Sequence, residues 1–347
     1  MSERVLTERE LNRALLARQL LLERSRLPIA RALERIGGIQ NQYAPNAYIR
    51  LRSCLEEFER DDLTRALERR TVVQGWLMRS TIHTVSGRDF PLFAAGIRRA
   101  RRDWWLRVQK ADAPKLAAVA RRLRSLLADG PLRQKELTEL LGRGPSGWGG
   151  AGLWVDLVRV PPSGTWEQRR ADLYGLAETW LRMDDSTEKD GLEHLVRRYL
   201  GGFGPAPLDD VASWAGVPVA TLRPIVDRLS LRRFRDERGG ELLDLPRAPL
   251  PPADAPAPVR LLPTWDATLL VHARRAGILP ERYRKIVFDT KLPPSLPTFL
   301  VDGRVAGAWK HEGARIALEP FERIPPSVRR ELAAEGERLL ELYRPPS

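Results

Sequence analysis

One segment of thirteen residues occurs twice in the chain, and it constrains the fold more than any other feature. Residues 130–142 (GPLRQKELTELLG) and residues 204–216 (GPAPLDDVASWAG) both begin with Gly-Pro and end with Gly. Each copy has the pattern of a turn, a short amphipathic helix and a glycine that ends the helix. The repeat therefore predicts two copies of one helical unit.

The second copy continues into a further helix over residues 217–229. Pro224 in its middle predicts a kink or a late start. The small Ala212 lets two helices touch, Gly216 four positions later allows a turn, and Leu222 closes the pocket between them. This is the spacing of a helix-turn-helix pair.

A basic hairpin follows this pair. Residues 232–245 predict two short strands around the turn residues Gly239 and Gly240. Helix, turn, helix and hairpin together make a winged helix, and the first copy has its own candidate wing near residues 161–170. The alternative is that both pairs are packing units that make no contact with DNA.

The rest of the chain predicts helices and strands around these units. A capping box of Thr7 and Glu10 opens a helix, and a proline-rich linker over 246–258 precedes runs that predict a small β-rich module. Helices are predicted over 6–23, 28–36, 61–70, 89–107, 115–129 and 326–343, and strands over 72–78, 80–85, 259–262, 298–301, 304–310 and 315–318.

The predicted fold class is α+β and mostly α, with tandem winged-helix units and a small β-rich C-terminal module. The expected domains are 1–112, a winged-helix-like domain; 113–188 and 189–246, a second and a third winged-helix domain; and 247–347, the linker and the β-rich module.

Arginine dominates a strongly basic composition. The chain carries 58 Lys plus Arg against 45 Asp plus Glu, a formal charge of +13, with arginine runs at 98–102 and 232–235. Guanidinium groups bind phosphate through paired hydrogen bonds, so the charge indicates a nucleic-acid partner. The alternative is that arginine usage reflects a GC-rich genome and the charge is spread evenly.

The sequence also predicts a compartment. A single cysteine, Cys54, excludes an internal disulfide and fits a reducing environment. The N-terminus is charged where a signal peptide would be apolar, and no run of about 18 apolar residues could span a membrane. We expect a cytoplasmic, nucleoid-associated monomer.

Standard cofactor motifs are missing from the sequence. There is no phosphate-binding glycine loop and no His-Glu-x-x-His helix, and the four histidines are scattered. The glycine-rich residues 147–150 follow no clear strand. We expect neither a metal nor a cofactor.

Two glutamines stand out directly after the helix-breaking Gly37 and Gly38. Gln40 and Gln42 are two positions apart, so in an extended backbone their side chains point to the same face. Both amides could then hold one small polar group, such as a water or a sugar hydroxyl. The alternative is that they are ordinary loop glutamines that bond to the backbone.

Several segments carry a family resemblance. Residues 38–45 (GIQNQYAP) and 78–90 (MRSTIHTVSGRDF) resemble the AlkZ-like winged-helix DNA glycosylases, a family that includes enzymes which unhook interstrand crosslinks. Residues 203–214, 261–266 and 301–309 resemble its C-terminal half. The resemblance implies tandem winged helices that form a concave DNA-binding scaffold, with Gln40 and Gln42 as the catalytic Gln-x-Gln pair. One departure is residues 272–275 (HARR), where an acidic residue is expected before the last arginine.

Amides suit only one kind of base excision. Glutamine cannot accept a proton, so it is not a general base. N7-alkylated guanine is already a cationic leaving group, so the enzyme need only place a water and stabilise the oxocarbenium-like charge. His83 could hold a phosphate, orient the water or support the hairpin.

The sequence thus predicts a monofunctional DNA glycosylase that acts on N7-alkylated purines or interstrand crosslinks in damaged duplex DNA, in DNA repair or in self-resistance to a genotoxin. The alternative is a non-catalytic winged-helix DNA-binding protein or transcriptional regulator. The predicted catalytic residues are Gln40, Gln42 and His83. The predicted DNA contacts are Arg50, Arg79, Ser80, Arg223, Arg232, Arg233, Arg235, Trp309 and Lys310.

Overall fold

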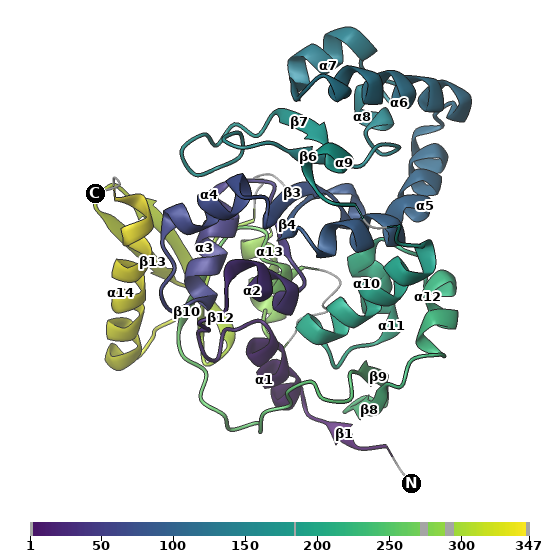
Figure 1. Cartoon of the computed structure of the whole chain (residues 1–347). Helices are drawn as coiled ribbons and strands as arrows, with labels where there is room; N and C mark the ends of the chain where they lie inside the picture. The colour runs from purple at the N-terminus through teal and green to yellow at the C-terminus, as the bar shows by residue number, and fades with distance from the viewer. Residues whose placement is uncertain (1–2, 184, 271–276, 289–294, 345–347) are drawn as a thin grey trace.

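The computed structural model describes residues 3–183, 185–270, 277–288 and 295–344. It is a mixed α+β fold, as predicted, in which helices take up more of the chain than strands (Figure 1). Among the described residues the strands form three sheets, with the orders β2-β4-β3-β6-β7-β5, β1-β8-β9 and β10-β11-β12-β13. The departure noted at residues 272–275 lies outside the described residues.

The first 112 residues contain the six-stranded sheet's first half and the helices around it. The elements are β1 (Val5–Leu6), α1 (Glu8–Arg18), α2 (Ile29–Ile36), β2 (Ile39–Gln40), α3 (Pro45–Cys54), α4 (Arg60–Glu68), β3 (Val72–Trp76), η1 (Met78–Ser80), β4 (Ile82–Ser86) and α5 (Asp89–Gln109).

Local signals set several of these boundaries. The capping box of Thr7 and Glu10 opens α1 as predicted. The predicted helix over 6–23 was too long, because α1 ends at Arg18 and Leu20 adopts a left-handed φ of 56°. The α3 helix was not predicted; Pro45 occupies its first turn, where the missing N–H costs nothing.

The two copies of the repeat occupy the same place in two runs of elements. The first run is α6 (Ala113–Ala128), β5 (Leu132–Arg133), α7 (Gln134–Leu141), α8 (Trp148–Ala151), β6 (Leu157–Arg159) and β7 (Leu173–Leu176), followed by α9 (Ala177–Trp180). The second run is α10 (Glu188–Phe203), a bridge at Ala206, α11 (Leu208–Ala215), α12 (Val219–Val226), β8 (Arg232–Asp236) and β9 (Glu241–Asp244).

In each run the short extended segment before the helix pair bonds to the last strand. β5 pairs with β7, and Ala206 bridges to Leu243 of β9. Gly216 makes the turn between α11 and α12 with a φ of 71°, where glycine is favoured. When the two runs are aligned, α7 corresponds to α11, and each is the first helix of its pair.

Strand pairing crosses the ranges expected for separate domains. β3 pairs with β6 through Gln74 and Arg159, and β1 pairs in parallel with β8 through Val5 and Arg235. The units on either side of residues 112 and 188 therefore share sheets, and the domain boundaries at these residues remain predictions.

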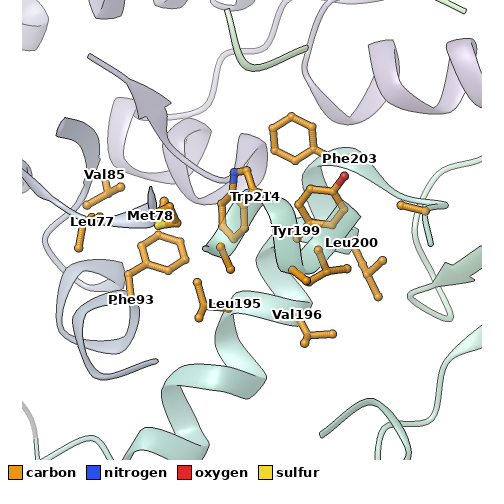
Figure 2. Packing of buried hydrophobic residues seen from close by; sticks show 14 of the residues in the cluster. Leu77, Met78, Val85, Phe93, Leu195, Val196, Tyr199, Leu200, Phe203 and Trp214 are labelled. Carbon is orange, nitrogen blue, oxygen red and sulfur yellow. The ribbon is translucent and has the colours of Figure 1, made fainter. Parts of the chain in front are cut away.

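Helices α5 and α10 pack closely at the main core. A Cβ built on Gly96 of α5 would lie 2.6 Å from the carbonyl carbon of Gly191 on α10, so only glycine permits this approach. Figure 2 shows Trp214 of α11 between Phe93 and Tyr199, with ring centroids 5.9 and 5.5 Å away. This core ties α11 to the N-terminal part of the chain.

The C-terminal part is a four-stranded antiparallel sheet with helices. Its elements are β10 (Arg260–Leu262), η2 (Ala267–Leu269), α13 (Glu281–Val287), β11 (Thr298–Val301), β12 (Arg304–Glu312), β13 (Arg315–Pro320), α14 (Pro326–Leu340) and η4 (Glu341–Tyr343). The Ser53 hydroxyl on α3 donates to the carbonyl of Leu261 on β10. The sheet is thus held against the helix that follows Gln42.

A buried ion pair links α1 to β9 and supports a stability prediction. Arg18 Nη1 lies 2.6 Å from Asp244 Oδ1, and both side chains are fully buried. Asp244→Ala should lower the free energy of unfolding by about 3–5 kcal/mol, since it leaves a buried charge without its partner. Urea unfolding measures this; Glu56→Ala, which breaks the exposed pair with Arg26, should cost less than about 1 kcal/mol. Equal losses would contradict the prediction.

Candidate active site

The two glutamines meet at the end of β2. Gln40 is the last residue of β2, where it pairs with His83 of β4, and it is 7% exposed, whereas Gln42 is exposed. The Gln40 Nε2 donates to the Gln42 Oε1 over 2.7 Å. The structure therefore brings the two amides together, although Gln42 lies in a bend beyond the strand, and bonds one directly to the other.

Glycine and asparagine shape the turn that holds the pair. Gly37 and Gly38 both adopt positive φ angles, of 80° and 81°, and a Cβ on Gly38 would lie 2.8 Å from Cγ1 of Val85. After the strand, the Asn41 N–H donates to the Ile82 carbonyl over 2.7 Å, and the Asn41 side-chain oxygen accepts from the Ala47 N–H over 3.3 Å. These bonds tie the Gln-Asn-Gln turn to β4 and α3.

Arg79 was predicted to contact DNA; in the structure it is half-buried and its guanidinium bonds within the protein. Its guanidinium donates to the Gln40 Oε1 over 2.6 Å and to the Trp214 carbonyl. Burial lowers the pKa of Arg79 to about 10, so it stays cationic at neutral pH. Arg79 and Ser80 have φ angles of 55° and 57°, a left-handed conformation that costs about 1–3 kcal/mol for each non-glycine residue. Ser80 is half-buried and lines a neighbouring cavity of about 210 Å³.

His83 is buried behind Gln40. It is 2% exposed, and its Nδ1 lies 3.1 Å from the Thr81 carbonyl, which can only accept, so Nδ1 carries the proton. Burial, and then the charge of Arg79, lower the pKa of His83 to about 3. A neutral, enclosed imidazole does not hold a phosphate, which corrects that part of the prediction for His83.

The buried His83 should make stability depend on pH. Its pKa of about 3 lies below the unfolded value of about 6.5, so between these values the unfolded chain binds one more proton and stability falls as the pH decreases. The difference in unfolding free energy between the wild type and His83→Gln should change by about 2 kcal/mol from pH 7 to pH 5. Urea titrations at both pH values test this, and a constant difference would contradict it.

A C-terminal segment forms the other wall of the site. The Asn46 side chain and Thr264 exchange hydrogen bonds of 3.0 Å, and Arg50 Nε lies 2.8 Å from Asp266 Oδ2. Both members of this ion pair are almost fully buried. Arg50 was predicted to contact DNA; its guanidinium is instead enclosed and bonded within the protein, which corrects that prediction.

A small cavity lies between the two walls. Its volume is about 10 Å³, close to the space that one water needs. Gln40, Arg50, Trp265 and Asp266 are among its lining residues. The sequence does not identify Asp266 and Asn46 as site residues, although residues 261–266 resemble a segment of the family.

The end of β6 and the loop that follows it contact the glutamine turn from outside. Arg159 Nη1 donates to the Asn41 carbonyl over 3.4 Å, and Arg169 Nη1 donates to the Tyr43 hydroxyl over 3.2 Å. Tyr43 is 45% exposed directly after Gln42. Sequence reasoning had assigned the loop around 161–170 as a candidate wing but had not connected it with Gln42.

The other predicted DNA contacts are spread over the molecule. Arg223 of α12 is exposed, and it makes no ion pair with any residue in the described ranges. Three hairpin arginines have acidic partners: Arg232 with Asp244, Arg233 with Glu241, and Arg235 with Glu3. Trp309 is 4% exposed and donates to the Leu262 carbonyl, which corrects its prediction, while Lys310 is exposed and lies 3.7 Å from Glu312.

Within the described ranges, no group of three or more His, Cys, Asp or Glu side chains could hold a metal ion. None of the helices in that part of the chain has the length and apolar character that a bilayer crossing needs.

A family model and a solved structure both match nearly the whole chain. A family model described as "DNA glycosylase AlkZ-like" matches residues 33–342, a range that includes Gln40, Gln42 and Asp266. The solved structure of the Streptomyces sahachiroi DNA glycosylase AlkZ superposes with a TM-score of 0.80 at 18% identity, and the match covers 97% of each chain. No curated protein sequence matches the chain.

Proposed function

Because the chain belongs to the AlkZ-like DNA glycosylase family, we propose that it hydrolyses the N-glycosidic bond of N7-alkylated purines or interstrand crosslinks in damaged duplex DNA. The observation that carries this proposal is the pair of bonded amides, one buried and one exposed, in a site where the neighbouring imidazole is neutral.

The chemistry follows from what amides can and cannot do. A water oxygen bonds to C1′ while the bond from C1′ to N9 breaks, and the departing electron pair neutralises the cationic base. Glutamine takes no proton in this step, so the water's proton leaves to solvent. The exposed Gln42 has a carbonyl dipole for the oxocarbenium-like charge, and both amides restrict where the water lies.

The same reasoning supports a monofunctional enzyme. A lyase needs an amine that forms a covalent imine with the sugar, and an amide cannot supply one. A labile cationic leaving group makes such a nucleophile unnecessary. We therefore infer a hydrolytic reaction that ends at an abasic site.

Two runs of elements support DNA binding by winged helices at 113–188 and 189–246. In both, a helix, a short extended segment, two helices and a hairpin follow in the same order. We infer that α12 is a recognition helix, since it is the second of its pair and carries the exposed Arg223. The range 1–112 would be the third, winged-helix-like unit.

An abasic-site assay tests the proposal. Duplexes that contain N7-methylguanine or an interstrand crosslink are incubated with the protein and heated in alkali, and strand cleavage at the lesion is read on a gel. Excision of either lesion supports the glycosylase. Tight duplex binding with no excision from any N7-alkylated or crosslinked duplex would favour the alternative, a non-catalytic DNA-binding protein or regulator.

A further inference from the structure

Three side chains form a chain of hydrogen bonds that ends at the exposed amide. Arg79 donates to the Gln40 Oε1 over 2.6 Å, and the Gln40 Nε2 donates to the Gln42 Oε1 over 2.7 Å. Gln42 makes no other side-chain hydrogen bond within the described part of the chain. The bonds therefore run from a half-buried cation, through a buried amide, to an exposed one.

Arg79 itself is fixed by the end of α11 and by the turn that follows this helix. Its guanidinium donates to the carbonyl of Trp214 near the end of α11. A Cβ built on Gly216 would lie 3.1 Å from the backbone nitrogen of Arg79, so the turn after α11 packs directly on this residue. The left-handed φ angles of Arg79 and Ser80 persist only because the surrounding structure imposes them.

The chemistry of arginine decides which way Gln40 faces. The two ends of an amide have nearly the same shape, so Gln40 alone could present either its oxygen or its NH₂ group to Gln42. A guanidinium only donates, so it requires the Gln40 oxygen. The Gln40 NH₂ group must then face Gln42, and Gln42 must accept with its oxygen.

We infer that Arg79 is a positioning residue that sets the orientation of the Gln40 amide, and that Gln42 is the amide that meets the substrate. This inference rests on the proposed function, because it assigns separate tasks within the proposed catalytic pair. Loss of Arg79 would allow Gln40 to reverse and Gln42 to turn its carbonyl away from the reacting sugar.

A double-mutant cycle tests the inference. Arg79→Met should slow single-turnover excision by about 10²-fold, the scale for a misplaced catalytic group, and should leave the Kd for the same duplex unchanged. Adding Arg79→Met to Gln40→Ala should cause no further loss, because both changes act through the same amide. A full additional loss in the Gln40→Ala background would overturn the inference, since Arg79 would then act only by supporting α11.

Arg70 provides a matched control. It also has a left-handed φ, of 60°, and its guanidinium lies 4.0 Å from the Trp180 ring and donates to the Trp180 carbonyl over 3.4 Å. Arg70→Met removes similar interactions away from the amide pair, so its excision rate should equal that of the wild type. An equal loss in Arg70→Met and Arg79→Met would also overturn the inference.

Two further measurements keep the test decisive. If Arg79→Met does not fold, Arg79→Gln replaces it. Glutamine can both donate and accept, so it no longer dictates the orientation of the Gln40 amide. An unchanged excision rate in Arg79→Gln overturns the inference. If the wild type excises no lesion, the proposed function fails. Crystal structures of the wild type and of Arg79→Met then test the inference separately. Loss of the hydrogen bond from Gln40 to Gln42 in the variant supports the inference, and its retention in the variant overturns it.

Discussion

Gln42→Ala should slow excision of an N7-alkylguanine by about 10²-fold or more, the scale for losing a positioning or dipolar contact in the transition state. Gln40→Ala should show a loss of similar size, because it removes the N–H that holds the Gln42 carbonyl. Neither amide carries a charge that neutralises phosphate, so the affinity for duplex DNA should change little. The measurement is a single-turnover rate on a defined lesion beside a binding isotherm on the same duplex.

Two further variants sharpen this test. Gln109→Ala removes an exposed glutamine at the end of α5 and should excise at the wild-type rate. Gln42→Glu introduces a carboxylate that could stabilise the cation but would repel phosphates, so weaker binding with a partly retained rate is expected. Wild-type excision rates in both Gln40→Ala and Gln42→Ala would mean that the glutamine pair has only a structural role.

Duplex affinity should fall steeply with salt and depend little on sequence. Each phosphate that the protein neutralises releases counterions, and a protein with 6–10 such contacts loses about 10³–10⁵ in affinity between 50 and 200 mM salt. The chain has a formal charge of +13, and exposed arginines such as Arg223 are available for these contacts. Fluorescence anisotropy over a salt series on two unrelated duplexes measures the slope.

Single arginine variants locate the contacts. Arg223→Ala should reduce the slope of log affinity against log salt by about one, the effect of losing one phosphate contact. Arg330→Ala is the control, since this exposed residue lies on α14, on the opposite side of the molecule from α12 in Figure 1, and it should leave the slope unchanged. Affinity that does not respond to salt, or no binding of any duplex at low salt, would refute the electrostatic argument.

Several arginines that contribute to the net charge are buried. Arg18, Arg50 and Arg101 are all enclosed and paired with aspartates. Their charges count toward the composition but do not reach the surface. The sequence cannot separate such arginines from exposed ones, because the acidic partner lies far away along the chain, as Asp266 does for Arg50.

Local rules account for what the sequence determined by itself. The capping box at Thr7 and the glycine turns at Gly37 and Gly216 follow from backbone sterics and neighbouring residues, which the sequence contains directly. The same holds for the repeated helix pairs. The convergence of Gln40 and Gln42 depends also on the bend at Gln42, because β2 ends at Gln40.

Tertiary structure decided what the site residues do. Arg79 is 39 positions from Gln40 and 135 from Trp214, and only the packing of α11 on η1 brings all three into one hydrogen-bonded group. Burial lowers the pKa of His83, so its imidazole is neutral at neutral pH. The fold also buries Gln40 and leaves Gln42 exposed. A side chain's charge, orientation and access to substrate depend on neighbours from distant segments, so the residue types came from the sequence and their roles from the fold.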